Sequence, residues 1–312
     1  MGKSCLIIDE MHESIVELLE KEGFMIAYQP EIRRNEILEI IGDFDGVIIR
    51  SKTSIDKEFL EAANKLKFIA RAGAGVDQID VTEVERRNIK VVNAPEGNRD
   101  AVGEHTVGML LTLFNKLHLA DRQVKDGIWD REGNRGHEIM GKTIGLIGYG
   151  HMGNAVAQRL SGFACEVIAY DKYKENFSDK YVKEVGMNEI FSRSEVVSFH
   201  VPLTHETKSM INDDYLSKFK KNIYLINTAR GEILVLEALK RQLEKGKILG
   251  AGLDVLEYEK YNSLNASQNE VYTYLKTSNK ILFTPHVAGW SHESYEKISQ
   301  VLYKKIKKLN IS

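Results

Sequence analysis

Residues 143–160 read TIGLIGYGHMGNAVAQRL, an apolar run, a glycine-rich turn and a helix-forming segment in succession. The apolar run 143–147 predicts a buried strand, and the segment after the glycines predicts a helix. Between the two, Gly148, Gly150 and Gly153 form the pattern GxGxxG in the strand-turn-helix setting that this pattern requires. Such a turn is typical of a doubly wound α/β sheet that binds a dinucleotide.

The glycines of this turn have separate parts. Gly148 permits the tight turn, Gly150 lets the backbone approach a pyrophosphate, and Gly153 lets the helix pack closely on the strand. The start of the helix, at His151 and Met152, offers free N–H groups and a positive dipole to phosphate groups. We therefore expect all five residues to contact the cofactor.

An acidic residue stands where a dinucleotide site needs one. Asp171 ends the next predicted strand, at the distance from the glycines at which a carboxylate binds the ribose hydroxyls of the cofactor. Because this carboxylate would repel a 2′-phosphate, NAD is favoured over NADP. Lys172, directly after it, leaves some tolerance of NADP open.

Short apolar strands alternate with helical patterns along the whole chain, which predicts βαβ units on parallel sheets. A punctuated stretch at 93–98 precedes a long apolar helix at about 100–115, and we expect a domain crossing there. The segment 291–309 has apolar residues at helical spacing and is expected to fold back onto the first series. The predicted strands are 5–8, 47–49, 68–70, 90–93, 143–147, 166–171, 195–201, 222–228, 248–254 and 281–284.

Length and composition narrow the class of protein. The 312 residues suggest two domains, and 43 basic against 45 acidic side chains leave no charge excess for binding nucleic acid. The two cysteines, Cys5 and Cys165, form no metal-ligand or disulfide pattern, so neither a metal site nor an oxidising compartment is expected. With no signal peptide and no membrane span in the sequence, we expect a cytoplasmic protein.

Three polar side chains follow different strands of the second series: Arg230, Glu259 and His286. Ligands of open α/β sheets bind at the carboxyl ends of the strands, so these groups are expected to converge. An arginine that binds a carboxylate and a histidine that exchanges a hydroxyl proton suit hydride transfer between a 2-hydroxy acid and a 2-oxo acid. Glu259 would pair with the imidazole.

The sequence resembles the D-isomer-specific 2-hydroxyacid dehydrogenase family over nearly its whole length, and most of all that family's phosphoglycerate dehydrogenase branch. The resemblance implies that Arg230, Glu259 and His286 are the catalytic set and that Asp254 contacts the nicotinamide carboxamide. The motifs that carry it, besides the glycine turn and the three catalytic segments, are IRS at 49–51, ARAGAGVD at 70–77, NAP at 93–95, GKT at 141–143 and HVPL at 200–203.

The resemblance also implies the remaining contacts. Further residues expected to line NAD are Val201, Pro202, Thr207, Thr228, Ala229 and Ala288. The substrate is expected to contact Arg50, Ser51, the backbone N–H groups of Ala74 and Gly75, Asn98 and Arg230.

The family's architecture implies two Rossmann-like domains, with the NAD-binding domain inserted into a flavodoxin-like substrate domain. The substrate domain would comprise 1–97 and 290–312, and the NAD-binding domain 98–289, through which a homodimer would form. Because the chain ends at Ser312, it resembles the short forms without a C-terminal regulatory domain.

The substrate is the least determined feature. A phosphorylated acid needs further cations, which Arg50, Lys52 and Arg71 would supply, and 3-phosphoglycerate, oxidised at the entry to serine synthesis, is the first choice. Glyoxylate, hydroxypyruvate and D-lactate need fewer cations and stay open. A regulatory protein that senses NADH is the remaining alternative.

One segment departs from the family pattern. Lys260 follows Glu259 where the family usually has proline, and residues 261–279 are longer and more polar than expected before the strand at 281–284. This departure affects the expected shape of the loop more than the role of Glu259.

Overall fold

The computed structural model describes residues 3–259 and 264–311, so the departure at Lys260 lies outside the described residues. The chain divides into two compact units, which are described separately. Unit 1 comprises Met1–Asp100 and Trp290–Ser312, and unit 2 comprises Ala101–Gly289. The sequence-based domains divide the chain at 97/98 and 289/290.

Unit 1 contains a parallel sheet that has five strands within the described residues, in the order β2-β1-β3-β4-β5. This is the flavodoxin-like order. The strands are β1 (Lys3–Ile7), β2 (Phe24–Tyr28), β3 (Gly46–Ile49), β4 (Phe68–Arg71) and β5 (Lys90–Asn93). The helices are α1 (Ser14–Lys21), α2 (Arg34–Ile40), α3 (Lys57–Ala62), α4 (Val81–Arg86) and α12 (His292–Lys308).

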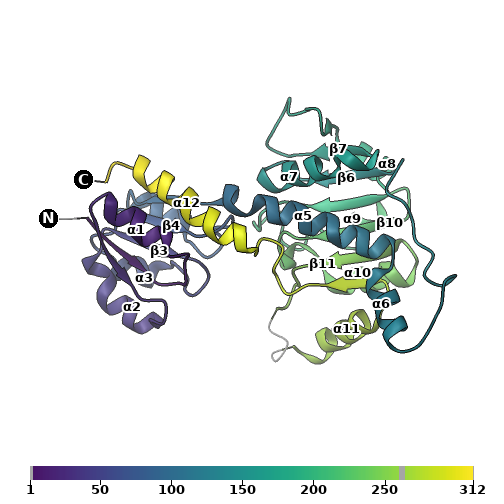
Figure 1. Cartoon of the computed structure of the whole chain (residues 1–312), viewed down its shortest axis with the longest axis horizontal. Coiled ribbons are helices and arrows are strands. Elements are labelled where there is room, and N and C mark those ends of the chain that lie inside the picture. The colour runs from purple at the N-terminus through teal and green to yellow at the C-terminus, as the bar shows by residue number, and fades with distance from the viewer. Residues whose placement is uncertain (1–2, 260–263, 312) are drawn as a thin grey trace. The chain divides into compact units, whose positions relative to one another are not determined.

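The C-terminal helix α12 completes the core of unit 1. It runs beside α1, as Figure 1 shows, and also contacts β4 and β5. Ile298, Leu302 and Ile306, at helical spacing, are buried in one cluster with Ile15 and Leu19 of α1. The two ends of the chain therefore build one hydrophobic core.

Unit 2 contains a parallel sheet of seven strands within the described residues, in the order β12-β11-β10-β9-β6-β7-β8. The strands are β6 (Thr143–Ile147), β7 (Glu166–Tyr170), β8 (Lys183–Glu184), β9 (Val196–Phe199), β10 (Ile223–Asn227), β11 (Ile248–Leu253) and β12 (Ile281–Phe283). The helices are α5 (Pro95–Phe114), which begins in unit 1, α6 (Leu117–Lys125), α7 (His151–Leu160), α8 (Met187–Arg193), α9 (Asp213–Ser217), α10 (Leu236–Glu244) and α11 (Ala266–Thr277).

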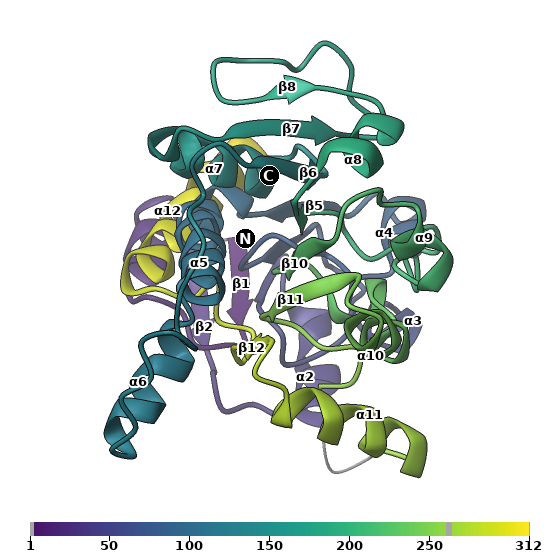
Figure 2. The same ribbon diagram turned by 90° about the vertical axis from the view of Figure 1, so that its right-hand side faces the viewer.

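The predicted fold class, α/β with two parallel sheets of Rossmann-like topology, is confirmed. In unit 2 the strand order reverses at β6, which lies between β7 and β9, while β8 forms the outer edge (Figure 2). Such a reversal opens a crevice at the carboxyl ends of the strands, where ligands of doubly wound sheets bind. The glycine turn follows β6 and therefore lies at this crevice.

Two helices differ from the sequence-based expectation. Helix α5 begins at Pro95 rather than near residue 100, because proline is favoured in the first turn of a helix. The polar segment 261–279 contains α11, which begins with a capping box formed by Asn265 and Gln268. No helix in the described parts of the chain is long and apolar enough to cross a membrane.

Candidate active site

The glycine turn has the geometry that a bound pyrophosphate needs. Gly148 has a φ of +93°, and a Cβ atom there would lie 2.6 Å from the carbonyl oxygen of His200. A Cβ atom on Gly153 would lie 2.2 Å from the carbonyl oxygen of Gly148, so the helix packs against the turn itself. At Gly150, by contrast, no described atom lies within 4 Å of the Cβ position. The turn is thus closed on its protein side and open above Gly150 and the N-terminus of α7, where His151 and Met152 lie.

Asp171 follows β7 and is fixed by the backbone around it. Its Oδ2 accepts a hydrogen bond of 2.8 Å from the Tyr149 N–H, and its Oδ1 accepts one of 3.0 Å from the Tyr173 N–H. The carboxylate is therefore held beside the glycine turn. This position fits a ribose with a free 2′-hydroxyl.

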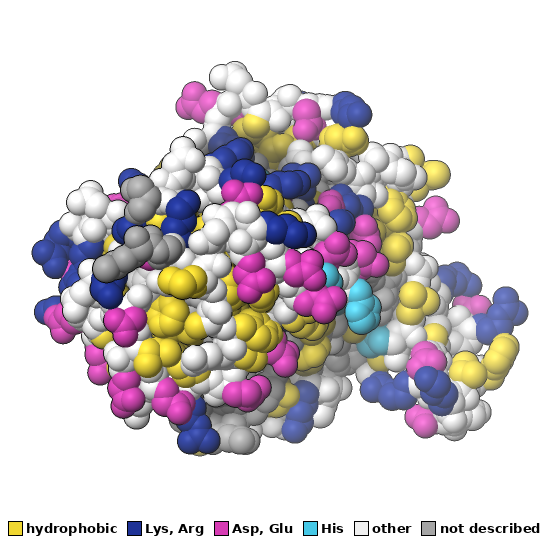
Figure 3. Space-filling model, turned by 60° about the vertical axis from the view of Figure 1, so that its left-hand side comes forward, with side chains coloured by type: hydrophobic (Ala, Val, Ile, Leu, Met, Phe, Trp, Pro, Cys, Tyr) yellow, Lys and Arg dark blue, Asp and Glu magenta, His cyan; other side chains and the backbone are white. Residues whose placement is uncertain are grey.

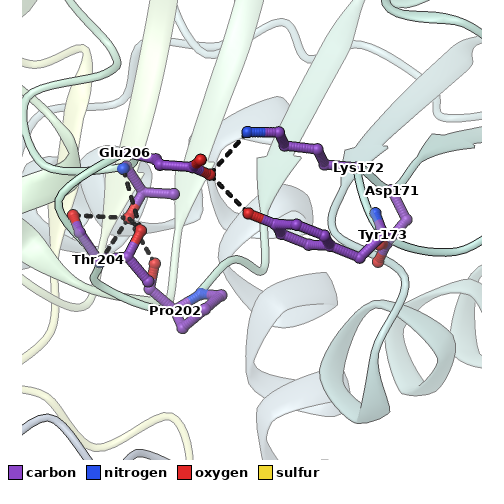
Figure 4. Close-up of polar contacts among 7 residues, drawn as sticks. Asp171, Lys172, Tyr173, Pro202, Thr204 and Glu206 are labelled. Carbon is purple, nitrogen blue, oxygen red and sulfur yellow. Dashed lines mark hydrogen bonds and ion pairs between the residues drawn. The ribbon is translucent and has the colours of Figure 1, made fainter. Parts of the chain in front are cut away.

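A charged contact lies directly beside Asp171 (Figure 4). The ammonium of Lys172 lies 2.7 Å from Oε2 of Glu206, and the hydroxyl of Tyr173 donates to the same oxygen at 2.6 Å. The hydrogen bond to Glu206 raises the pKa of Lys172, and the one from Lys172 lowers the pKa of Glu206. Lys172 is thus engaged by a residue that follows a different strand.

The segment after β9 forms a compact turn in which Val201 packs against the core of unit 2. The hydroxyl of Thr207 donates to the carbonyl of Pro202 at 2.7 Å and accepts from the N–H of Thr204 at 2.8 Å (Figure 4). Just before this turn, burial lowers the pKa of His200 to about 4, so its imidazole is neutral near pH 7. The turn is held by its own hydrogen bonds.

The segment after β10 is shaped by Asn227, a buried side chain. Its Oδ1 accepts from the N–H of Ala229 at 3.0 Å, and its Nδ2 donates to the carbonyl of Arg230 at 2.9 Å. The hydroxyl of Thr228 lies 3.1 Å from that of Thr106 on α5. These contacts fix the backbone that carries Arg230.

Asp254, which follows β11, organises the loop that carries His286. Only 2% of Asp254 is exposed, and its carboxylate accepts hydrogen bonds from Thr284 Oγ1 (2.5 Å), Val287 N–H (2.9 Å) and Ala288 N–H (2.9 Å). Its backbone carbonyl accepts from the N–H of His286 at 2.8 Å. His286 itself has a left-handed backbone, with a φ of +54°, which is uncommon for a residue with a side chain.

The predicted catalytic side chains lie together within unit 2. Nδ1 of His286 lies 3.1 Å from Oε1 of Glu259. The hydrogen bond from His286 lowers the pKa of Glu259, and the charges of His286 and Arg230 act in the same direction. An imidazole that a carboxylate orients can take up or release a proton at Nε2. The guanidinium of Arg230 can bind an anionic ligand beside it.

Apart from Arg230 in unit 2, the predicted substrate residues lie in unit 1. The guanidinium of Arg50, directly after β3, lies 3.5 Å from the ring centroid of Trp290. Ala74 and Gly75 belong to the loop after β4, which Asn93 holds through a 2.6 Å hydrogen bond to the Ala74 carbonyl. Ser51 is exposed beside Arg50, and Asn98 lies in the first turns of α5, where its Oδ1 has no hydrogen-bond partner among the described residues.

The sheet order, the glycine turn and Asp171 define unit 2 as a dinucleotide-binding unit. Residues 107–288 match the family model for the NAD-binding domain of D-isomer-specific 2-hydroxyacid dehydrogenases. The chain belongs to this family of NAD-dependent oxidoreductases.

The names of similar proteins refer to different substrates. The chain is 33% identical to hydroxypyruvate reductase of Thermotoga maritima over 96% of this chain and 95% of the relative. It is 35% identical to D-3-phosphoglycerate dehydrogenase of Methanocaldococcus jannaschii over 97% of this chain, but spans only 57% of that longer protein. It also resembles the structure of D-lactate dehydrogenase from Aquifex aeolicus with NAD and lactic acid, with 28% identity, a TM-score of 0.82, and 98% and 95% coverage of this chain and that one.

Sequence reasoning did not identify several residues that shape the site. Glu206 and Tyr173 fall outside the recognised motifs, and Glu206 is 34 residues from Lys172, its partner. His105 of α5 places its Nε2 3.0 Å from the hydroxyl of Thr284, although the two are 179 residues apart. The sequence carries no local signal for such contacts, because they depend on which loops the sheet brings together.

Proposed function

We propose that this enzyme interconverts 3-phosphoglycerate and 3-phosphohydroxypyruvate with NAD, the step that opens serine synthesis. The supporting observation is that three cationic residues have their backbones at one edge of the sheet in unit 1. Arg71 ends β4 opposite Ile49 of β3, and Arg50 and Lys52 follow β3 directly. Because β3 and β4 are neighbours, the backbones of these residues lie at the same edge, where their side chains can meet a substrate with two anionic groups. For this the ammonium of Lys52 exchanges its contact with the Pro30 carbonyl for one with the substrate.

The proposed mechanism gives His286 the proton. As the hydroxy acid is oxidised, Nε2 of His286 takes the hydroxyl proton, and it returns that proton when the oxo acid is reduced. Glu259 orients the imidazole from Nδ1 and stabilises its protonated form. Arg230 binds the substrate carboxylate through its planar fork and polarises the neighbouring carbonyl. NAD, when bound, supplies the two-electron acceptor or donor.

The remaining contacts follow the same proposal. Asp171 binds the ribose hydroxyls, and the carboxylate of Asp254, besides holding the His286 loop, binds the nicotinamide carboxamide. The turn at Gly148, Gly150, His151, Met152 and Gly153 holds the pyrophosphate, with Val201, Pro202, Thr207, Thr228, Ala229 and Ala288 lining the rest of the cofactor. The substrate carboxylate also meets Ser51, Asn98 and the N–H groups of Ala74 and Gly75.

A specific observation favours a second candidate, hydroxypyruvate or glyoxylate reduction. The Arg50 guanidinium is stacked on Trp290, and the backbone N–H of Arg50 donates to the carboxylate of Asp9 at 2.7 Å. Burial lowers the pKa of Arg50, while the charges of Asp9 and Glu10 act in the opposite direction. Carboxylates beside Arg50 weaken its attraction for a dianionic phosphate. Lactic acid, the ligand named for the Aquifex structure, needs no phosphate site at all.

The test is a comparison of substrates with the purified protein. The loss of NADH absorbance is followed with 3-phosphohydroxypyruvate, hydroxypyruvate, glyoxylate and pyruvate in turn. We expect the highest kcat/KM with the phosphorylated acid. In the Lys52→Met variant, kcat/KM should fall for that acid alone. Preference for hydroxypyruvate or glyoxylate would select the second candidate, and preference for pyruvate would select D-lactate as the hydroxy acid. Tight NADH binding without turnover would select an NADH-sensing regulatory protein.

His286→Ala tests the proton assignment in the same assay. Loss of a general acid–base lowers kcat by about 10²–10⁴-fold, while NADH affinity, measured by fluorescence titration, stays near the wild-type value. His292→Ala, a histidine at the start of α12 in unit 1, is the matched control. Near-normal turnover by the His286 variant would contradict the assignment.

We also propose that the protein acts in the cytoplasm as a homodimer formed through unit 2. Helix α6 supports the dimer, because none of its residues is buried in the single chain. Exposed large apolar side chains gather in and after this helix: Leu117, Val124, Ile128, Trp129 and Met140. An amphipathic helix without a buried face needs a partner to cover it.

The proposed cytoplasmic location is supported by the two cysteines. Both are free thiols, which fit a reducing compartment.

A further inference from the structure

We infer that Glu206 strengthens the preference of this enzyme for NAD over NADP by holding the ammonium of Lys172 away from the place of a 2′-phosphate. Glu206 is thus a specificity-determining residue that acts through Lys172. The inference rests on the NAD-binding unit alone and not on which acid is the substrate. It therefore stands independently of the function proposed above.

The three side chains form one cluster at the rim of the adenosine side of the site (Figure 4). Oε2 of Glu206 lies 2.7 Å from Nζ of Lys172 and 2.6 Å from the hydroxyl oxygen of Tyr173. Lys172 and Tyr173 directly follow Asp171, whereas Glu206 comes from the turn after β9. A single carboxylate oxygen thus ties the end of β7 to the turn that carries Pro202 and Thr207.

Lys172 would otherwise be suited to bind NADP. A cation next to the ribose-binding residue is the usual means by which Rossmann sites accept a 2′-phosphate. Here the ammonium of Lys172 is already paired with the carboxylate of Glu206. A phosphate would have to displace that carboxylate and would then be repelled by both Glu206 and Asp171. Lys174, the next lysine along this loop, is also engaged, because its ammonium donates to the carbonyl of Tyr149 at 2.8 Å.

Tyr173 supports the orientation of Glu206. The residue is 79% exposed, so its hydroxyl makes the hydrogen bond to Glu206 at the surface rather than in the core. That hydrogen bond raises the pKa of Tyr173 and, together with Lys172, keeps Glu206 ionised. The carboxylate therefore stays charged throughout the neutral pH range.

The expected size of the effect follows from the exposure of the pair. The side chains of Lys172 and Glu206 are 54% and 37% exposed, so solvent screens their attraction. An exposed ion pair changes an equilibrium by up to about fivefold. Glu206 therefore adjusts cofactor preference by several fold, and Asp171 remains the stronger determinant.

Glu206→Gln tests the inference directly, because it removes the charge and keeps the shape. Dissociation constants of NADH and NADPH are measured by fluorescence titration of the whole protein without an acid substrate. We expect the affinity for NADPH relative to NADH to rise about fivefold. The rise should disappear in the double variant Glu206→Gln/Lys172→Met, because the released ammonium is what binds the phosphate.

Two further variants separate this role from a general charge effect. Glu270→Gln breaks a lysine pair of the same 2.7 Å length elsewhere in unit 2 and should leave the NADPH-to-NADH ratio unchanged. Lys172→Met alone should change that ratio less than twofold, about 0.4 kcal/mol, because Glu206 already neutralises Lys172 in the unaltered chain. The inference is wrong if Glu206→Gln does not raise the affinity for NADPH relative to NADH, or if that rise persists in the double variant without Lys172. It is also wrong if Glu270→Gln gives the same rise, or if Lys172→Met alone weakens the binding of NADPH.

Discussion

Gly150 and Gly153 belong to the same turn but have opposite surroundings. A methyl group on Gly153 would collide with the carbonyl oxygen of Gly148, whereas a methyl group on Gly150 would point into open space. Of these two glycines, the fold requires Gly153, whereas Gly150 matters only when a ligand approaches. Stability and cofactor affinity can be separated at these two positions.

Gly153→Ala should lower the free energy of unfolding of unit 2 by about 1–3 kcal/mol, because the added carbon has no room. Gly150→Ala should change stability by less than about 1 kcal/mol, since its φ of −86° is accessible to alanine. The same variant should bind NADH about tenfold more weakly, a cost of about 1.4 kcal/mol. Chemical denaturation and fluorescence titration of both variants check this. Equal effects of the two substitutions on stability would contradict the assignment.

Individual site residues differ in how far the sequence predicts them. Asp171 is predictable because its distance from the glycines follows from the length of one helix and one strand. The left-handed backbone of His286 is not, because it depends on the buried carboxylate and carbonyl of Asp254, which follows the neighbouring strand β11. The pairing of Lys172 with Glu206 is hidden for the same reason. Local patterns predict where a residue lies, and tertiary contacts determine what its side chain meets.

At the scale of elements, α12 shows how a segment far along the chain can be essential to the first domain. Leu302 is fully buried against α1 and the sheet, while its neighbour Val301 is only partly covered. Leu302→Ala should destabilise unit 1 by about 2–5 kcal/mol, and Val301→Ala by about 1 kcal/mol or less.

Hydrogen exchange of the intact chain measures both effects, because the amides of β1 report on unit 1 and those of β6 on unit 2. We expect the protection of β1 to fall in Leu302→Ala while that of β6 stays unchanged. Loss of protection in both units would mean that α12 stabilises more than the core described for unit 1.

The elements themselves were predictable in proportion to their apolar content. Strands such as β3 and β9 are buried at every position, and their apolar runs, interrupted in β9 by Ser198, identify them. Strand β2 lies at the edge of its sheet, is only partly buried and was not predicted. Helix α11 was expected as a polar loop, because only Val271 and Leu275 are buried among its residues. Periodicity detects burial, so partly exposed elements escape it.

At the scale of the whole molecule, the surface of unit 2 bears on the homodimer proposed above. Basic and acidic side chains are interspersed on the face that Figure 3 shows, in keeping with the balanced 43 and 45 charges. In unit 2, helix α6 and the loop after it extend away from the sheet (Figure 2). Trp129 in that loop is 79% exposed. An exposed tryptophan beside an uncovered helix is typical of an interface residue.

Trp129→Asp should therefore weaken the proposed dimer, because it replaces an apolar anchor by a charge. Removing a tryptophan that contributes about 2 kcal/mol to the binding free energy raises the dissociation constant of a dimer about 30-fold. Light scattering over a range of protein concentrations measures the mass of wild type and variant. Met25→Asp, an exposed apolar residue on β2 of unit 1, is the matched control and should leave the mass unchanged. A monomeric wild type, or an unchanged dimer in Trp129→Asp, would exclude α6 and its loop as the interface, whereas dissociation in the Met25 variant would place the interface on unit 1.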